Sequence, residues 1–468
     1  MASHDFSGNY MVLRPEEVGL VDLFLTLWCC DIEKRAFVEC SEGKKKIHFR
    51  YRWFIFLSVL GQKILLSLAK PMSNFGSWFE QWLNLPSYNS KSWVLLLCDL
   101  LRGKLLMTDK TSETFVSIFG HLDKRVELDR DIKPGDTRYH AALSAMASKI
   151  AYENKAFIET TVRDHWKMEV LGSYDFWNDF QEKETTQAFF FHDKNDDSDV
   201  IVVAFRGTEP YDADAWCTDL DLSWYEIPGM GKIHGGFMKA LGLLRYRGWP
   251  MEIEKDAKHQ LAYYSIREKL KEQLQLQGNC RTRFIVTGHS LGGALAILFP
   301  AILAFHEETW LLNRLEGVYT FGQPRVGDKE FKDFMEEQLQ NYGFKYLRFV
   351  YCNDIIPRLP MDDSTFLFKH FGTCLYYNSC YGGKILEEEP NKNYFKLLDW
   401  IPILLNAIWE LVRSFIIPYT KGPDYAEGWL LKSARVFGLV FPGLAAHNPQ
   451  DYVNSTRLGA AAIYLQLQ

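Results

Sequence analysis

The sequence predicts an α/β protein with a mostly parallel central sheet. From about residue 136 onward, apolar runs of strand length alternate with segments of helical periodicity. Several of these runs end in polar or glycine-rich turns, as at the carboxyl edge of a parallel sheet. The stretch 283–296, RFIVTGHSLGGALA, joins a strand, a sharp turn and a helix start.

The elements of this sheet can be placed in chain order. A helix over 136–154 begins the domain, with its alanines and aliphatic residues near one face. Residues 200–205 (VIVVAF) form a buried strand, and 261–274 form a helix that leads into the strand of the central motif. Residues 317–322 and 346–351 are the next two strands, and polar turns follow both.

The central motif has the G-x-S-x-G pattern of a nucleophile elbow. In such a turn the backbone of Ser290 is strained, and its side chain is lifted clear of the sheet. Gly288 and Gly292 flank it because a Cβ there would collide with the neighbouring strand or helix. Five residues of this kind also occur by chance, but here a strand precedes them and a helix follows. We therefore predict that Ser290 is the nucleophile of a protein with the α/β-hydrolase fold.

A serine nucleophile needs a base within hydrogen-bond reach and an acid that orients the base. In α/β-hydrolases these follow in the order Ser, Asp or Glu, His. Asp354 comes directly after the strand 346–351 and downstream of Ser290. A plain turn is the alternative, since Asn-Asp pairs favour turns. We predict that Asp354 is the acid.

Two histidines follow Asp354 along the chain. His370 lies in LFKHF, a predicted strand, where a structural role suits it better. His447 lies in a predicted loop, from which it can reach over the sheet edge, so we predict that His447 is the base. We expect His289 to point away from the site although it precedes the nucleophile, and His234 to be a structural loop histidine.

The tetrahedral intermediate needs two fixed N–H donors for its oxyanion. The backbone N–H of Leu291, directly after the nucleophile, is one candidate. Thr208, at the end of FRGT (205–208), is the other, and its hydroxyl would add a third hydrogen bond. The alternative for Thr208 is an ordinary turn that ends a strand.

Residues 1–134 differ in character from the rest. A basic cluster at 44–52 is followed by the apolar runs 53–61 and 64–69, and we expect Pro71 to end the second run. Further apolar runs lie at 93–97 and 100–107.

None of these runs reaches the roughly 20 uninterrupted apolar residues of a membrane span. The pattern instead predicts segments that lie in a lipid interface, where basic residues meet anionic head groups. A helical subdomain packed on the catalytic core is the alternative.

A second region that differs from the alternating strands and helices lies at about 381–436. Aliphatic residues recur at helical spacing over 401–415, and Trp400 and Trp409 are typical of an interface. Either a helix packed on the core or a second membrane-lying helix would produce this pattern. The predicted division is a lipid-associating region over 1–134 and a catalytic domain over 135–468 that contains this insert.

The composition excludes several classes of protein. A net charge of −6 and an isoelectric point near 6.1 argue against nucleic acid as a partner. The nine cysteines show neither metal-ligand spacing nor a disulfide framework, which indicates reduced thiols in a cytosolic setting. The polar residues 1–17 contain no apolar signal core and no transit pattern.

The motifs also resemble a known family. GHSLGGALA (288–296), FRGT (205–208), YTFGQPRVG (319–327) and NDIIPRLP (353–360) resemble the class 3, fungal-type triacylglycerol lipases. The similarity covers roughly residues 136–376 and resumes near His447. The flanking regions most resemble the plant oil-body lipases.

The resemblance implies a Ser290–Asp354–His447 triad, no metal or organic cofactor, and a lid at 209–225 that contains Trp216. It implies hydrolysis of triacylglycerol at the cytosolic face of lipid droplets. A phospholipase A1 or galactolipid acyl hydrolase is the nearest alternative, and a non-catalytic interaction protein is a more distant one. The insert is absent from the compact fungal enzymes. The sequence leaves acyl-chain selectivity and oligomeric state open.

Overall fold

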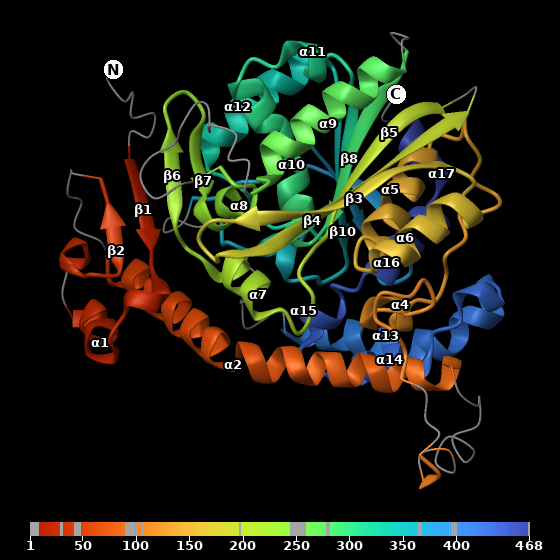
Figure 1. The fold of residues 1–468 in the computed structure, drawn as a ribbon, viewed down its shortest axis with the longest axis horizontal. Coiled ribbons are helices and arrows are strands. Elements are labelled where there is room, and N and C mark those ends of the chain that lie inside the picture. The colour runs from red at the N-terminus through yellow and green to blue at the C-terminus, as the bar shows by residue number, and fades with distance from the viewer. Residues whose placement is uncertain are drawn as a thin grey trace.

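The computed structural model describes residues 9–28, 31–41, 48–88, 99, 101–103, 107–195, 198–243, 259–277, 281–362, 367–392, 394 and 400–466. The predicted apolar run 93–97 and half of the run 100–107 lie outside these residues. A twisted sheet forms the centre of the molecule, with helices on both faces, and one long helix, α2, crosses below it (Figure 1).

The central sheet has eight strands in the order β12-β11-β10-β9-β8-β5-β4-β3. Its five middle strands are parallel, which confirms the predicted sheet: β5 (Ser198–Phe205), β8 (Arg283–His289), β9 (Leu315–Phe321), β10 (Lys345–Tyr351) and β11 (Thr373–Tyr377). Antiparallel strands flank them: β3 (Glu169–Asn178), β4 (Lys183–Asn195) and β12 (Gly383–Leu386).

Alternate side chains of the parallel strands enter two separate cores, as the pleat of a strand requires. Along β5, Val200, Val202 and Ala204 face the core that contains α5 (Tyr139–Ile150) and α16 (Pro449–Leu458). The side chains between them face the core built by α8 (Gly235–Ala240), α9 (Ala262–Leu276), α10 (Leu291–Phe305) and α12 (Lys329–Tyr342). Both faces of the sheet are therefore buried, which explains its continuous apolar runs.

Short elements complete the described fold. They are η1 (Pro15–Glu17), α1 (Leu20–Trp28), η2 (Ile32–Lys34), α4 (Ile118–Leu122), α6 (Lys155–Thr160), η3 (Thr161–His165), α7 (Ala213–Leu220), α11 (Thr309–Leu312), η4 (Ile356–Arg358), η6 (Pro423–Tyr425), α15 (Pro442–Ala445) and α17 (Ala461–Leu465).

A second, four-stranded sheet was not predicted. Its order is β2 (Val38–Cys40), β1 (Asn9–Leu13), β6 (Trp224–Ile227), β7 (Gly231–His234). Strand β1 pairs antiparallel with β6, with Tyr10 opposite Tyr225. Residues from the predicted N-terminal region thus share a sheet with residues of the predicted catalytic domain, and the division at residue 134 stays a prediction.

Helix α2 (Phe49–Tyr88) runs for 40 residues and contains both Pro71 and Pro86. Pro71, expected to end the apolar run 64–69, does not end the helix. Proline removes one helical hydrogen bond, but α2 contacts the domain on both sides of Pro71. The carbonyl of Gln62 accepts a hydrogen bond from Cys217, and Gly76 packs closely on Tyr211.

By length and composition alone, α2 over Phe49–Pro86 and α13 (Trp400–Lys421) are long and apolar enough to cross a membrane. The separate apolar runs, none of which reaches this length without interruption, join into the single helix α2. In the most apolar window of each helix, 28% and 33% of the residues are buried against the rest of the chain.

The predicted insert is attached to the core by buried charges. It holds α13 and α14 (Trp429–Phe437), and Arg435 of α14 donates to Asp451 of α16 at 2.9 and 3.0 Å and to Glu427 at 2.8 Å. Arg413 of α13 donates to the same Asp451 at 3.0 Å. Burial opposes ionisation of Asp451, but the two arginines outweigh it and lower its pKa. Because α16 follows His447 directly, the insert fixes the segment that carries this histidine.

Replacing Arg435 with Met should test this attachment. The substitution leaves Glu427 and Asp451 buried with one partner fewer, so the free energy of unfolding should fall by about 3–5 kcal/mol. Arg283→Met is the control, since that side chain is 53% exposed and pairs with Glu316 on the surface; it should cost less than about 1 kcal/mol. Equal losses in chemical denaturation would contradict the role assigned to the buried cluster.

Candidate active site

Ser290 occupies the junction between β8 and α10. Its backbone has φ 59° and ψ −128°, a conformation that non-glycine residues seldom adopt. Its N–H donates to Phe321 O on the adjacent strand at 2.9 Å. A Cβ on Gly288 would lie 2.2 Å from the backbone of Gly292, and a Cβ on Gly292 would lie 2.4 Å from Phe205 O. Both positions therefore require glycine for the tight turn to form.

Asp354 and His447 meet beside this turn although 93 residues separate them. Asp354 follows β10 and is fully buried, and its Oδ2 lies 2.7 Å from Nδ1 of His447. His447 follows α15. Gly322, after β9, has φ 60°, and a Cβ there would lie 2.8 Å from the His447 ring and 2.9 Å from Asp354 Oδ2. Glycine at 322 thus leaves room for the pair.

Two further donors hold Asp354. The backbone N–H of Ile356 donates to Oδ1 at 2.9 Å, and the hydroxyl of Tyr452, on α16, donates to Oδ2. Burial raises the pKa of Tyr452, and the negative charge of Asp354 raises it further, so the phenol stays a proton donor. Sequence reasoning missed Tyr452, which no motif marks; its only signal is its place five residues after His447.

The expectation that His289 points away from the site is wrong. Its ring lies 4.5 Å from the ring of His447, centroid to centroid, at an angle of 31°. Its Nδ1 lies 2.8 Å from the hydroxyl of Tyr152. Burial lowers the pKa of His289 far below its usual range, and the nearby His447 lowers it further. His289 is therefore a neutral ring packed against His447.

The segment after β5 lies next to the elbow. A Cβ on Gly207 would lie 2.4 Å from His289 O, which places Thr208 beside Ser290. Leu291 is the first residue of α10, and the first N–H groups of a helix have no acceptor within it. The two predicted oxyanion donors therefore come from neighbouring strand ends on the same side of the sheet.

Helix α7 covers this corner. Its Asp219 accepts a hydrogen bond from the hydroxyl of Thr208 at 2.7 Å. Burial raises the pKa of Asp219 to about 7, against the opposing effects of the Thr208 hydrogen bond and the charge of His447. Trp216, predicted as a lid residue, is half-buried on α7 and donates to Pro210 O at 3.2 Å.

The described conformation is closed. Ser290 is 6% exposed, and Nε2 of His447 is shielded from solvent and has no hydrogen-bond partner among the described residues. In the structure, His447 is hydrogen-bonded to Asp354, but its Nε2 is not hydrogen-bonded to the hydroxyl of Ser290. Such bonds are often long in unliganded enzymes and tighten when substrate binds.

The remaining predicted histidines lie elsewhere. His370 is not in a strand: it precedes β11, and its Nε2 donates to Pro357 O at 2.7 Å. His234 ends β7 and stacks on Phe237, with ring centroids 4.0 Å apart, and burial lowers its pKa to about 4. Within the described ranges, no group of three or more His, Cys, Asp or Glu side chains is arranged to hold a metal ion.

A buried serine on an elbow, beside an Asp–His pair, defines the site of a serine hydrolase. The family described as lipase (class 3) matches residues 202–364, which contain Ser290 and Asp354. The chain belongs to this family, and the predicted family and α/β-hydrolase fold are confirmed.

The similarity to known proteins extends beyond residues 202–364. "Triacylglycerol lipase OBL1" of Arabidopsis thaliana is 43% identical over 96% of this chain and 95% of its own length. The tobacco (Nicotiana tabacum) protein of the same name is 43% identical over 88% of this chain and 84% of its own length. Among solved structures, a fungal lipase–inhibitor complex aligns with 58% of this chain and 94% of its own, at 23% identity and a TM-score of 0.39.

Gly322→Ala should show whether activity depends on the contact between His447 and Asp354, apart from any loss of fold stability. The added methyl group would push His447 and Asp354 apart, so hydrolysis of a soluble short-chain ester should fall about 100-fold or more. Gly343→Ala is the matched control. Gly343 has φ 69° and no neighbour within 4 Å of a built Cβ, so it carries the same backbone strain of about 1–2 kcal/mol without touching the site. Similar activity in the two variants would contradict the geometry.

Proposed function

We propose that this chain is a triacylglycerol lipase that uses Ser290 as nucleophile, His447 as base and Asp354 as the acid that orients it. The observation that carries the proposal is the 2.7 Å contact between Asp354 and His447 beside the strained Ser290. Two relatives with the printed name triacylglycerol lipase match over most of this chain, which supports the substrate class.

The chemistry follows from these positions. Nε2 of His447 accepts the hydroxyl proton while the oxygen of Ser290 bonds to the ester carbonyl carbon. The N–H groups of Leu291 and Thr208 hold the oxyanion. Collapse of the intermediate breaks the ester bond, and the glycerolipid oxygen leaves with the proton from Nε2. Water then attacks the acyl-enzyme by the same route and releases the fatty acid.

Asp354 accepts a hydrogen bond from Nδ1–H of His447 and so leaves Nε2 free to act as base. Its negative charge stabilises the imidazolium that forms in each step. The bonds from Tyr452 and Ile356 fix the orientation of the carboxylate.

We assign α7 the role of the lid, with Trp216 on it. An ester cannot approach Ser290 in the closed conformation, and α7 contacts Thr208 through Asp219. Displacement of α7 would break this bond, together with the contacts of α7 to neighbouring elements, and open the site from this side.

The proposed place of action is the cytosolic face of a lipid droplet, with residues 1–134 contributing the lipid-associating region and 135–468 the catalytic domain. A phospholipase A1 is the alternative substrate assignment. An Arabidopsis thaliana protein named phospholipase A1-IIbeta is 31% identical, but over only 30% of this chain. The longer matches favour triacylglycerol.

Purified full-length protein should hydrolyse emulsified triacylglycerol, and Ser290→Ala should lower that rate by at least about 1,000-fold while the melting temperature stays close to that of wild type. Phosphatidylcholine vesicles serve as the competing substrate. Preferential cleavage of the vesicles would overturn the substrate class, and full activity in Ser290→Ala would overturn the nucleophile.

The pKa of Asp219 predicts a pH dependence. Between its ordinary pKa of 3.8 and about 7, the folded carboxyl keeps a proton that the unfolded chain has lost. The free energy of unfolding therefore falls as pH rises through this window and is constant, for this group, above it. Asp219→Asn should remove this dependence, so the melting temperature of the variant relative to wild type should rise between about pH 4 and 7. A constant difference across the window would contradict the assignment.

A further inference from the structure

Helix α2 covers the proposed lid along its whole length. A Cβ on Gly61 would lie 3.4 Å from the side chain of Leu220, and a Cβ on Gly76 would lie 2.6 Å from Tyr211. The end of α7 thus lies under the earlier part of α2, and the residues before α7 lie under the later part. The two helices run antiparallel, and Gly76 allows close contact at its end, whereas a Cβ on Gly61 would make an ordinary van der Waals contact.

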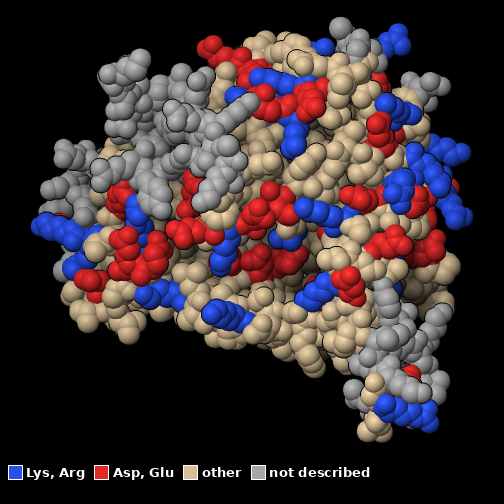
Figure 2. All heavy atoms as spheres, viewed as in Figure 1, with Lys and Arg blue, Asp and Glu red and all other residues tan. Residues whose placement is uncertain are grey.

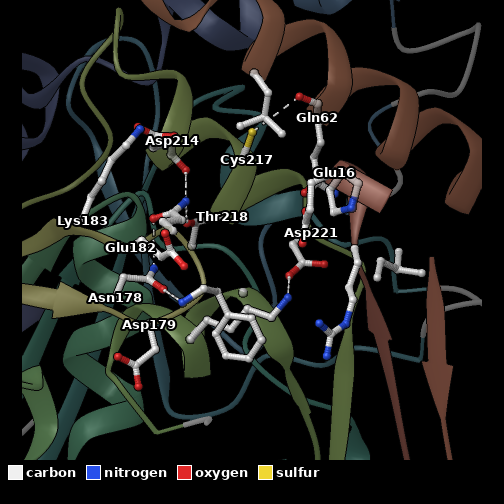
Figure 3. A pocket seen from close by; sticks show the side chains of 18 of the residues that line it. Glu16, Gln62, Asn178, Asp179, Glu182, Lys183, Asp214, Cys217, Thr218 and Asp221 are labelled. Atoms are coloured by element: carbon white, nitrogen blue, oxygen red, sulfur yellow. Dashed lines mark hydrogen bonds and ion pairs between the residues drawn. The ribbon is translucent and has the colours of Figure 1, made fainter. Parts of the chain in front are cut away.

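Specific contacts join α2 to α7 and to the residues just before α7. The hydroxyl of Ser58 donates to Leu220 O at 2.6 Å. The thiol of Cys217 donates to Gln62 O at 3.7 Å (Figure 3). The ring of Tyr211 meets Phe75 edge-on at 5.4 Å. Helix α7 therefore cannot leave the site unless α2 moves with it or these contacts break.

A pocket lies on another flank of α7. Its volume is about 490 Å³, and its lining includes Asp214, Cys217 and Thr218 of α7 together with Gln62 of α2 and Lys183 of β4 (Figure 3). The described lining contains neither Ser290 nor His447. Open space on this side leaves α7 less tightly packed than a core helix.

The opposite face of α2 is apolar and unburied. It continues onto the C-terminal insert, because Trp82 of α2 meets Trp429 of α14 edge-on at 6.2 Å. In Figure 1, α2, α13 and α14 lie together along the lower side of the molecule. We leave out Leu66, which lines the pocket, and Phe75, which contacts Tyr211. We call the other exposed apolar residues of these helices the lower face: Phe49, Trp53, Leu57, Ile64, Leu68, Trp78, Trp400, Ile401, Leu404, Leu405, Ile408, Trp409, Val412, Phe415, Ile416, Tyr419, Trp429, Val436 and Phe437.

On these three helices the carboxylates face the protein, whereas some of the cations are exposed. The helices contain only two carboxylates, Glu80 and Glu410. Glu80 accepts a hydrogen bond from Ile118 N at 3.1 Å, and burial raises its pKa to about 7. Glu410 is 4% exposed and pairs with Arg435. Exposed cations remain at Arg50, Lys70 and Lys421, and Figure 2 shows the lower rim mostly tan with patches of Lys and Arg.

An apolar surface with cations and no outward carboxylate fits the phosphate head groups and acyl chains of a lipid monolayer. The helices lie along this surface and do not cross it. Forty residues of α2 extend about 60 Å, twice the roughly 30 Å of a hydrocarbon core. Along this length, Ser58, Gln62, Gln81 and Asn84 make polar contacts with the domain.

We propose that the lower face docks α2, α13 and α14 in the plane of a phospholipid-covered lipid surface, and that α2 links this docking to displacement of α7. This inference rests on the proposed function only in taking α7 as the cover of Ser290. The N-terminal helix and the C-terminal insert then form one lipid-binding surface, and its contact with lipid releases the cover.

Flotation of the full-length protein tests the docking. The probe is protein-free triacylglycerol droplets coated with phosphatidylcholine and phosphatidic acid. Ile401→Asp with Leu405→Asp, on the exposed side of α13, should lower the bound-to-free ratio about 100-fold. Leu276→Asp is the control, because this residue is equally exposed at the end of α9, away from the lower face. Unchanged binding of the double variant, an equal loss in the control, or binding that needs droplet proteins would overturn the docking surface.

Hydrogen exchange of Ser290→Ala protein tests the coupling without catalysis. On addition of the same coated droplets, amide exchange over 211–220 should increase at least about fivefold in the otherwise unchanged protein. The double α13 variant should show no increase at the same lipid concentration. Exchange that stays unchanged while the protein is bound would overturn the coupling.

A second variant acts on the contact between the helices. Gly76→Val forces α2 away from Tyr211, so hydrolysis of a soluble short-chain ester without lipid should rise severalfold, and stimulation by droplets should shrink. Gly428→Val is the control, since a Cβ there meets no neighbour within 4 Å. Equal stimulation of both variants would overturn the role of α2. If the proposed function failed instead, Ser290→Ala would keep its activity, whatever the flotation and exchange results.

Discussion

The structure depends on one crowded point, where the turn at Ser290, His447 and Asp354 meet with almost no free space. Gly288, Gly292 and Gly322 all lie where a Cβ would overlap backbone or triad atoms. The parallel strands bring their carboxyl ends to this place, and the absence of three side chains lets them meet. Because Ser290 is strained there, the rest of the fold must hold the turn in position.

Two layers of support surround this point. The nearer layer consists of side chains that contact the pair directly: Tyr452 donates to Asp354, and His289 packs on the ring of His447. The outer layer is the buried charge cluster of the insert. In it, Arg413 and Arg435 meet Asp451 in the first turn of the helix that follows His447. An insert that is absent from the compact fungal enzymes therefore helps to position His447.

The opposite side of the site contrasts with this rigidity. Helix α7 lies between Thr208 and α2, next to an open pocket, and α2 carries an unburied apolar face. A tightly packed elbow under a loosely packed cover suits an enzyme whose substrate is a separate lipid phase. The chemistry needs fixed geometry, and access needs movement.

The sequence by itself determined the local features. The parallel sheet, the strand–turn–helix at Ser290 and the need for Gly288 and Gly292 follow from apolar periodicity and steric contact between close neighbours. Asp354 and His447 could be selected because chain order and position after a strand restrict the choice. The structure places this pair in contact, as the prediction requires.

Only the tertiary structure decided the rest, because it depends on contacts between distant residues. Tyr452 and Asp219 carry no motif, and they matter because folding brings them to Asp354 and Thr208. The continuation of α2 through Pro71 and the pairing of β1 with β6 are set by packing against segments more than 140 residues away, which no local pattern records. For the same physical reason, the sequence could suggest two apolar segments, one before residue 134 and one in the insert, but only the fold places them side by side. The fold also places the first of them over α7.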